Sequence, residues 1–247
     1  MPEIEIKSGI EIHQQLDTNK LFCNCPSLLR KDNPDYKFER KLHLVAGETG
    51  EIDVAAGFEA GKNKKFIYQC YYDNNCLVEL DECPPYEINE EALKIALQIS
   101  LLLNCEIIPY TQIMRKTVID GSNTSGFQRS VLIARNGWIE TSGGKIGIQT
   151  LMLEEDAARI ISQEKDKTIY RLDRLGIPLV EIATSPDIKN SNQAKEVALK
   201  LGDILRACKV KRGLGTIRQD VNLSVNVDGK QGERIEIKGV QEPDLIA

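Results

Sequence analysis

The chain has 247 residues, of which 28% are charged and 41% are hydrophobic. This is the composition of an ordinary globular protein, long enough to bury one sizeable core or two smaller ones, and it excludes collagen-like, fibrous and disordered chains. The formal net charge is −5, so no global positive field draws the protein to nucleic acid or to an anionic membrane, and any such contact needs a local basic patch.

The cysteine content and the N-terminal segment indicate an intracellular chain. Seven cysteines are present, an odd number that disfavours a closed disulfide framework. The N-terminal segment has no apolar run after basic residues, and no stretch approaches the roughly 18 apolar residues of a membrane span. We therefore expect a cytoplasmic protein with reduced thiols and no membrane partner.

Two periodicities divide the chain into strands and helices. Residues 3–13 alternate isoleucine with polar residues, which predicts a half-buried strand. Residues 89–104 begin with Asn89 and two glutamates and continue almost entirely apolar, which predicts a buried helix. A further strand is expected to begin at Ile146, and apolar residues at helical spacing in 191–208 predict an amphipathic helix lying on a sheet.

The last part of the chain predicts a hairpin. Residues 220–227 and 235–238 each alternate apolar with polar residues, and Asp228-Gly229 between them is a turn signal. The elements do not follow the regular alternation of a doubly wound parallel sheet, and the sequence has neither Pro-rich linkers nor solenoid repeats. The predicted fold class is therefore α+β, with a mostly antiparallel sheet and helices on one side.

The glycine-rich segments do not form nucleotide-binding motifs. Residues 57–63 have one residue too few between their glycines for a phosphate-binding loop, and they lack the Ser or Thr that follows its lysine. Residues 141–145 predict a turn. His43 is expected to be structural.

Carboxylates occur on the polar face of one predicted strand and at the end of another. Glu11 and His13 are two residues apart, so both side chains point to one face and could share a cation or a proton. A solvated sheet face is the alternative for this pair, because two-residue patterns recur by chance. Glu154, Glu155 and Asp156 follow an apolar run, and adjacent acids repel one another unless a cation or a base neutralises them.

Three further acids extend this pattern. Glu181 stands in an apolar segment and needs a partner if it is buried, while Asp220 and Glu236 occupy the polar faces of predicted strands. Each could be a solvated residue, but the repetition favours a cluster suited to Mg2+, which prefers oxygen ligands and bridges nucleotide phosphates. Positive charge for phosphate could come from Arg115, Arg129, Arg171, Arg174 and Lys238. The small polar residues of 120–130 suit a loop around a polar or anionic substrate, with a simple surface turn as the alternative.

Several segments, in order, resemble one protein family. Residues 9–16 and 20–26, GIEIHQQL and KLFCNCP, look like the opening signature of the tRNA-dependent amidotransferases that include the bacterial B and archaeal E subunits. The matches continue through LEEDA, DRLGIPLVEI, SPDI, RQDVN and IEIK at residues 153–157, 173–182, 185–188, 218–222 and 235–238. The resemblance covers nearly the whole chain and is greater to the archaeal E type than to the bacterial B type.

The resemblance implies a catalytic cradle domain, with residues 1–247 as the N-terminal part of a kinase and transamidase. The family uses ATP and Mg2+ to phosphorylate the side-chain carboxylate of glutamate mischarged on tRNA(Gln). Ammonia then displaces phosphate to give Gln-tRNA(Gln) for protein biosynthesis. The activation is needed because a carboxylate resists ammonia until one oxygen becomes a leaving group.

The resemblance also implies residue roles. The expected magnesium ligands are Glu11, His13 and Glu155, with Glu154, Asp220 and Glu236 as further candidates around them. Arg174 and Lys238 are expected to neutralise phosphate and to act in catalysis with Glu11, His13 and Glu155. The loop that holds the aminoacyl end is expected to use Asn123, Ser125, Gln128, Arg129 and Ser130.

The resemblance implies partners as well. The sequence has no glutaminase or amidase residue set, so ammonia is expected from the family's asparaginase-like D subunit, in a heterotetramer of two D and two E subunits. The family continues after residue 238 with an insertion and with helical and tail domains that grip tRNA, so we expect this chain to be part of a longer protein. Two lysine-rich segments, 62–65 and 209–212, are either tRNA contacts or solvated loops. The alternative functions are a non-catalytic module that presents aminoacyl-tRNA and an ATP-dependent carboxylate–amine ligase with a small-molecule substrate.

The cysteine pattern allows two interpretations, a zinc site or reduced thiols. Cys23 and Cys25 form a C-x-C pair that would need two more ligands. Bacterial relatives that bind zinc supply a later C-x-x-C pair, whereas here Cys76 is followed three positions on by Glu79. Cys76 with Cys83 or Cys70 would complete a site at irregular spacing, and reduced apolar thiols are the alternative.

Overall fold

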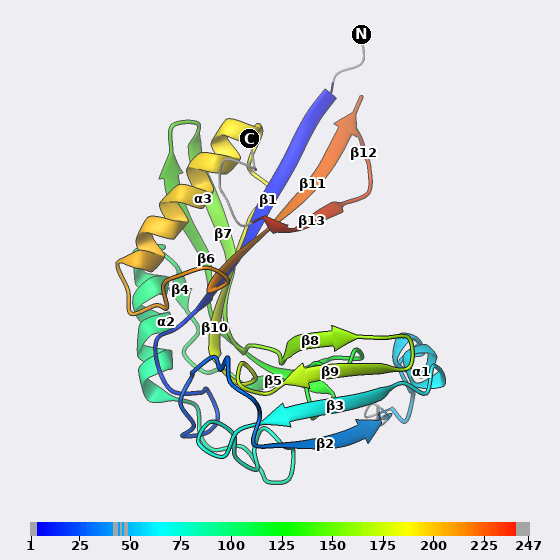
Figure 1. Cartoon of the computed structure of the whole chain (residues 1–247). Coiled ribbons are helices and arrows are strands. Elements are labelled where there is room, and N and C mark those ends of the chain that lie inside the picture. The colour runs from blue at the N-terminus through cyan, green and yellow to red at the C-terminus, as the bar shows by residue number, and fades with distance from the viewer. Residues whose placement is uncertain (1–3, 42–43, 45, 47–48, 241–247) are drawn as a thin grey trace.

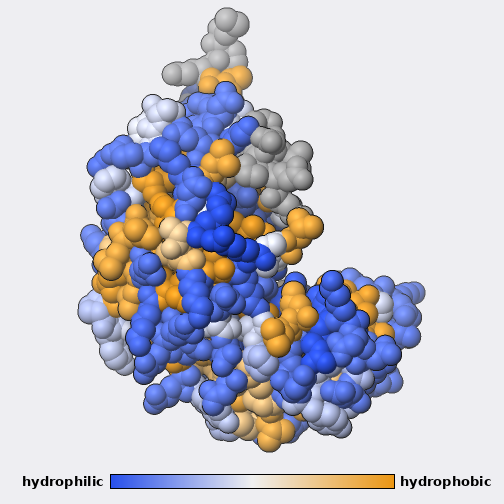
Figure 2. All heavy atoms as spheres, turned by 60° about the vertical axis from the view of Figure 1, so that its left-hand side comes forward, coloured by the Kyte–Doolittle hydropathy of each residue, from blue (hydrophilic) through white to orange (hydrophobic). Residues whose placement is uncertain are grey.

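The computed structural model of the chain describes residues 4–240 except 42, 43, 45, 47 and 48, so the prediction for His43 lies outside the described residues. The strands form a large and a small sheet that diverge from a common junction (Figure 1). The space-filling view shows the corresponding larger body and smaller lobe, with a hollow between them (Figure 2). No helix among the described residues is long and apolar enough to cross a membrane.

The large sheet is antiparallel and has nine strands among the described residues, seven of them in the order β12-β11-β1-β10-β7-β6-β4. Two further strands pair at its margins, β13 with β11 and β5 with β6. Its strands are β1 (Ile4–Gln15), β4 (Glu106–Ile107), β5 (Ile113–Thr117), β6 (Phe127–Thr141), β7 (Gly144–Glu155), β10 (Pro178–Thr184), β11 (Ile217–Val227), β12 (Lys230–Gln231) and β13 (Ile235–Val240).

Two helices cover one face of this sheet, as the sequence predicts (Figure 1). They are α2 (Glu90–Leu102) and α3 (Ser191–Arg206), and the side chains of Asn89 and Asn190 cap their N-termini. Ile10 and Ile12 of β1 are buried in the core beneath these helices. The other face of β1, which carries Glu11 and His13, is thereby left for polar contacts.

The predicted hairpin is confirmed at the end of the large sheet. Val227 of β11 pairs with Lys230 of β12 across the two-residue turn Asp228-Gly229. Both turn residues have positive φ, 49° and 80°, as a type I′ turn requires. The expected turn at residues 141–145 is also present, because Thr141 pairs with Gly144 between β6 and β7.

The small sheet was not predicted as a separate unit. It has the order β2-β3-β9-β8, and its strands are β2 (Tyr36–Lys41), β3 (Lys65–Cys70), β8 (Arg159–Gln163) and β9 (Lys167–Arg171). The pair β3–β9 is parallel, and α1 (Val54–Gly61) occupies the segment excluded as a phosphate-binding loop. Tyr68 and Tyr170 of this sheet donate their hydroxyls to the backbone carbonyls of Gly121 and Asp120 at 2.7 Å, so the sheet anchors the polar loop at 120–126.

Candidate active site

Adjacent strands of the large sheet bring a histidine and two glutamates together. His13 of β1 lies opposite Glu181 of β10, and Glu154 lies near the end of β7, the next strand. His13 Nε2 is 3.2 Å from Glu181 Oε2. One ligand atom from each of His13, Glu154 and Glu181 lies within 4.8 Å of the others. We call these three residues the imidazole–carboxylate cluster.

A lysine from an edge strand neutralises this cluster. Lys116 of β5 places Nζ 2.5 Å from Glu154 Oε1 and 3.7 Å from Glu181 Oε2. Glu154 also accepts hydrogen bonds from Ser130 Oγ at 2.8 Å and Gln128 Nε2 at 3.2 Å. The Lys116 side chain is 47% exposed and that of Glu154 only 1%, so the lysine is free to move away whereas the carboxylate is fixed.

The pKa shifts in the cluster follow from burial and charge. Burial, together with the charge of Glu181, raises the pKa of Glu154 despite its contact with Lys116. Burial also opposes ionisation of Glu181, but the hydrogen bond from His13 and the charge of Lys116 hold its pKa below the usual value. Burial lowers the pKa of His13, and the hydrogen bond and charge of Glu181 outweigh burial and raise it overall. Glu154 is therefore the carboxylate whose ionisation depends most on a nearby cation.

Two arginines share the buried Asp156, which follows β7, and one of them lies beside the cluster. Arg218 of β11 is the cross-strand partner of His13, and its Nη2 lies 3.2 Å from Asp156 Oδ1. Arg174 Nε lies 3.7 Å from the same oxygen and donates to the carbonyl of Ala157 at 2.7 Å. Burial lowers the pKa of Arg174, and the nearby charge of Arg218 acts in the same direction. This end of the sheet therefore holds more guanidinium charge than Asp156 balances.

Glu155 lies apart from the cluster, on the opposite face of β7 from Glu154. It is buried against Arg129, whose Nη1 lies 3.1 Å from Glu155 Oε2. The pocket beside this pair is lined by Asn123 and Ser125 of the polar loop. The structure thus divides the predicted substrate loop: the side chains of Gln128 and Ser130 contact the Glu154 carboxylate, while Asn123, Ser125 and Arg129 line the same pocket as Glu155.

The remaining predicted ligands lie outside the imidazole–carboxylate cluster. Glu11 accepts from Asn222 Nδ2 at 3.1 Å and is the cross-strand partner of Asp220. Asp220 accepts from the backbone of Gly239 at 2.7 Å. On β13, Lys238 Nζ lies 3.2 Å from Glu236 Oε2, and its side chain is 73% exposed. The expected roles of these four acidic and basic residues stay predictions.

A second group of ligand atoms forms where the C-x-C pair meets a distant loop. Atoms of Cys23, Cys25, Cys76 and Glu79 lie within 4.8 Å of one another. The Cys23 thiol donates to Glu79 Oε1 at 2.8 Å, and a hydrogen bond from Cys23 lowers the pKa of the Cys25 thiol to about 7. Cys83 is not in this group, and its thiol donates to the carbonyl of Pro84 at 3.2 Å.

Sequence reasoning missed three residues of these groups. Lys116 and Arg218 gave no local signal, because only strand register shows that they reach the acids. Glu79 was noted for replacing a cysteine but was not counted as a possible ligand. Glu181 did carry a signal, because a carboxylate in an apolar segment needs a partner.

Comparison with known proteins identifies the class of domain. The family model described as the GatB/GatE catalytic domain matches residues 6–247, nearly the whole chain. The chain therefore belongs to the GatB/GatE catalytic-domain family, which confirms the resemblance drawn from the sequence.

Three similar curated proteins come from archaea. The E subunit of glutamyl-tRNA(Gln) amidotransferase from Methanocaldococcus jannaschii is 59% identical over 246 residues, which are 99% of this chain and 38% of the relative. The protein of the same name from Thermococcus sibiricus is 57% identical over 98% of this chain and 38% of the relative. The one from Archaeoglobus fulgidus is 53% identical over 99% of this chain and 40% of the relative. The chain thus spans about two fifths of the length of these relatives.

Proposed function

We propose that this chain is the part of a tRNA-dependent amidotransferase that uses ATP to activate the side-chain carboxylate of glutamate on Glu-tRNA(Gln). The observation that carries the proposal is the imidazole–carboxylate cluster beside the two arginines on Asp156. A cation site next to surplus guanidinium charge suits the transfer of a phosphoryl group, which depends on positioning and charge neutralisation. The names of the relatives support this substrate.

The imidazole–carboxylate cluster fits Mg2+. His13, Glu154 and Glu181 offer one nitrogen and two carboxylate oxygens within 4.8 Å, and a lysine ammonium lies between the two carboxylates. These three residues would hold the ion, with waters and phosphate oxygens completing its shell. When bound, Mg2+ neutralises the negative charge that develops on a transferring phosphoryl group.

The protein's own residues orient the two substrates. Arg174 and Arg218 retain N–H groups for the phosphates of ATP, since Asp156 balances only one of their charges. Gln128 and Ser130 contact Glu154 on the face of the imidazole–carboxylate cluster, and there we place the glutamyl carboxylate that attacks ATP. The pocket lined by Asn123, Ser125 and Arg129 lies beside Glu155 on the other face of β7, and its predicted role in holding the aminoacyl end stays a prediction.

The reaction then proceeds in two displacements. A side-chain carboxylate oxygen of the glutamyl group attacks the terminal phosphorus of ATP, and ADP leaves with the electron pair of the broken bond. Ammonia attacks the carbonyl carbon of the acyl phosphate, phosphate departs, and the nitrogen loses a proton to give the amide. Both steps need water excluded from the acyl phosphate, so a pocket that encloses the glutamyl end is required.

The nitrogen source and assembly complete the proposal. An asparaginase-like D subunit would supply ammonia, in a heterotetramer of two D and two E subunits, and the substrate places the enzyme in the cytoplasm. Further domains of the full-length protein would hold the body of the tRNA.

We also propose a structural zinc ion at the second ligand group. Cys23, Cys25, Cys76 and Glu79 supply four ligand atoms, the number that zinc prefers. Cys25 is the thiol most ready to ionise, as a thiolate ligand must. This set of four ligands contains Glu79 in place of Cys83, the residue predicted from the sequence.

ATP hydrolysis by the full-length protein with its asparaginase-like partner tests the proposal. We expect ADP formation that requires Glu-tRNA(Gln). No turnover would support the aminoacyl-tRNA-presenting module instead, and turnover without any tRNA requirement would support a ligase for a small molecule. Within the assay, Glu155→Ala tests the predicted role of Glu155: intact turnover would remove it from the metal ligands.

A further inference from the structure

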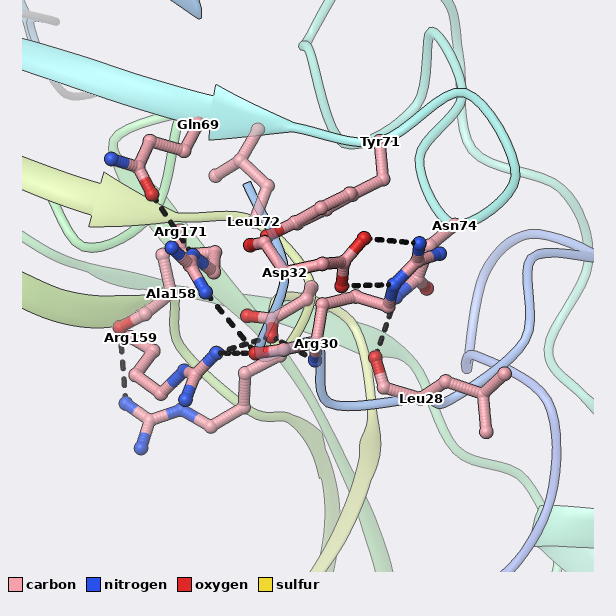
Figure 3. Close-up of polar contacts among 12 residues, drawn as sticks. Leu28, Arg30, Asp32, Gln69, Tyr71, Asn74, Ala158, Arg159, Arg171 and Leu172 are labelled. Atoms are coloured by element: carbon pink, nitrogen blue, oxygen red, sulfur yellow. Dashed lines mark hydrogen bonds and ion pairs between the residues drawn. The ribbon is translucent and has the colours of Figure 1, made fainter. Parts of the chain in front are cut away.

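Two arginines face each other across the small sheet. In the β8–β9 pairing, Arg159 lies directly opposite Arg171. Like charges in this position destabilise an antiparallel pair. The two guanidinium groups nevertheless converge: Arg159 Nη2 and Arg171 Nη1 both donate to the backbone carbonyl of Arg30, at 2.7 and 3.1 Å (Figure 3).

The carboxylates nearby balance only part of this charge. Asp173 is fully buried and lies 2.6 Å from Arg159 Nη2. Arg171 forms no ion pair with a carboxylate in the part of the chain that the structure describes, and its Nε donates to the neutral amide oxygen of Gln69 at 2.9 Å. Arg171 therefore carries a charge that no acid neutralises directly.

The third arginine of Figure 3 does not relieve this imbalance. Arg30 is engaged by Asp32 at 2.6 Å and by Asp73 at 2.5 Å. Its guanidinium carbon lies 4.6 Å from the centre of the Tyr71 ring, and that of Arg171 lies 5.8 Å from the same ring. The ring and the Arg30 carbonyl thus hold the Arg171 guanidinium in place, which prepares it for an anionic ligand.

We infer that Arg171, with Arg159, binds a phosphate group of the RNA backbone of the substrate; this rests on the proposed function and names a contact that holds its RNA. Nε and Nη1 of Arg171 already donate to Gln69 and Arg30, whereas Nη2 has no acceptor among the described residues, and its N–H groups suit a phosphate oxygen. Arg174 and Arg218 share Asp156, whereas Arg159 and Arg171 face each other on β8 and β9 and share the Arg30 carbonyl. Because the charge of Arg159 reaches Arg174, the test below measures nucleotide and RNA binding separately.

The lysine-rich segments are weaker candidates for the same contact. Lys62, Lys65 and Lys209 each pair with a glutamate, at 2.5, 2.8 and 2.6 Å. Lys211 is partly buried and donates to the backbone carbonyl of Ser27. Lys64 and Arg212 form no ion pair among the described residues, but Arg171 combines such an unbalanced charge with a position fixed by Gln69 and the Arg30 carbonyl at the end of β9.

Direct RNA binding tests the inference. The dissociation constant of the full-length protein, in complex with its asparaginase-like partner, for a tRNA(Gln) transcript is measured without ATP over a salt series. Arg171→Gln is expected to weaken binding about tenfold and to reduce the slope of log K against log salt by about 0.7 to 0.9, as for one lost phosphate contact. Arg171→Lys keeps the positive charge but loses the planar guanidinium group. It is therefore expected to keep the wild-type salt slope and to bind tRNA with intermediate affinity.

A matched control variant and a measurement of ATP affinity complete the experiment. Arg40→Gln removes one positive charge from β2 of the same sheet, where Arg40 pairs with Glu82, and is expected to bind tRNA like the wild type. ATP affinity is expected to be unchanged in Arg171→Gln. Equal tRNA affinities of Arg171→Gln and Arg40→Gln would overturn the inference, as would weakened ATP binding with normal tRNA binding. Because RNA binding is measured without ATP, absent ATP turnover would contradict only the proposed function.

Discussion

The buried pair Arg129 and Glu155 allows a quantitative prediction. Their side chains are only 12% and 6% exposed, and the arginine offers Glu155 three hydrogen bonds at 3.1 to 3.4 Å. Arg129→Met keeps an apolar stem but removes the charge and the side-chain bonds. Removing one partner of a buried pair leaves an uncompensated charge and costs about 3 to 5 kcal/mol. For a domain of this size, the melting temperature Tm should fall by about 6 to 20 °C.

The pH dependence of this loss has a definite sign. Burial raises the pKa of Glu155 even beside Arg129, so the folded chain holds the Glu155 proton more tightly than the unfolded chain. The stability contributed by protonated Glu155 is therefore lost as pH rises from about 4.3 through the raised pKa. Without Arg129 the pKa rises further, so the variant should lose most stability at neutral pH and much less in acid.

Calorimetric melting of Arg129→Met and the double variant Arg129→Met, Glu155→Gln measures these effects. The double variant should recover most of the lost stability at neutral pH, because its buried group is neutral. Arg135→Met is the control, since Arg135 is 57% exposed and lies 3.8 Å from Glu106, and its cost should stay below about 1 kcal/mol. Equal melting of Arg129→Met and Arg135→Met, or no recovery in the double variant, would refute the reasoning.

Three further predictions concern separate features. The His13 imidazole should titrate above its usual pKa by NMR, and Glu181→Gln should lower that pKa; an unchanged pKa would contradict the contact. Gly121→Ala should cost about 1 to 3 kcal/mol, because φ is +81° and a Cβ would lie 2.5 Å from the Phe66 ring. Gly57→Ala in α1 meets nothing within 4 Å and should be neutral or stabilising in the same denaturation assay, so equal losses would count against this account. Elemental analysis should find one zinc per chain and little in Cys76→Ser; no zinc in the wild type would exclude the structural ion.

The regular elements could be predicted because their signals are local. Asn89 and Asn190 stand where helices begin, and the alternation in β1 sets the faces of Glu11 and His13. Asp228-Gly229 specifies a turn by itself. The small sheet gave no such signal, because its parallel pair β3–β9 joins segments about a hundred residues apart and each strand has only five or six residues.

The candidate site could be predicted by residue type but not by grouping. The two carboxylates Glu154 and Glu155 are adjacent in sequence, yet strand alternation sends them to opposite faces, one to His13 and the other to Arg129. Lys116 reaches the cluster through the β5–β6–β7 register, which no local pattern encodes. Long-range pairing therefore decided which acids lie together.

The dependence of ATP turnover on Mg2+ tests the central claim most directly. The full-length protein, with its asparaginase-like partner and Glu-tRNA(Gln), is assayed over a magnesium series as wild type, Glu181→Gln and the control Glu5→Gln, whose acid lies on an exposed part of β1. We predict that Glu181→Gln raises the Mg2+ concentration for half-maximal turnover by about tenfold or more, because even the loss of a group that only supports a metal ligand lowers metal affinity by about tenfold. Glu5→Gln is expected to leave this concentration unchanged. The same magnesium dependence in all three proteins would contradict a metal site at His13, Glu154 and Glu181.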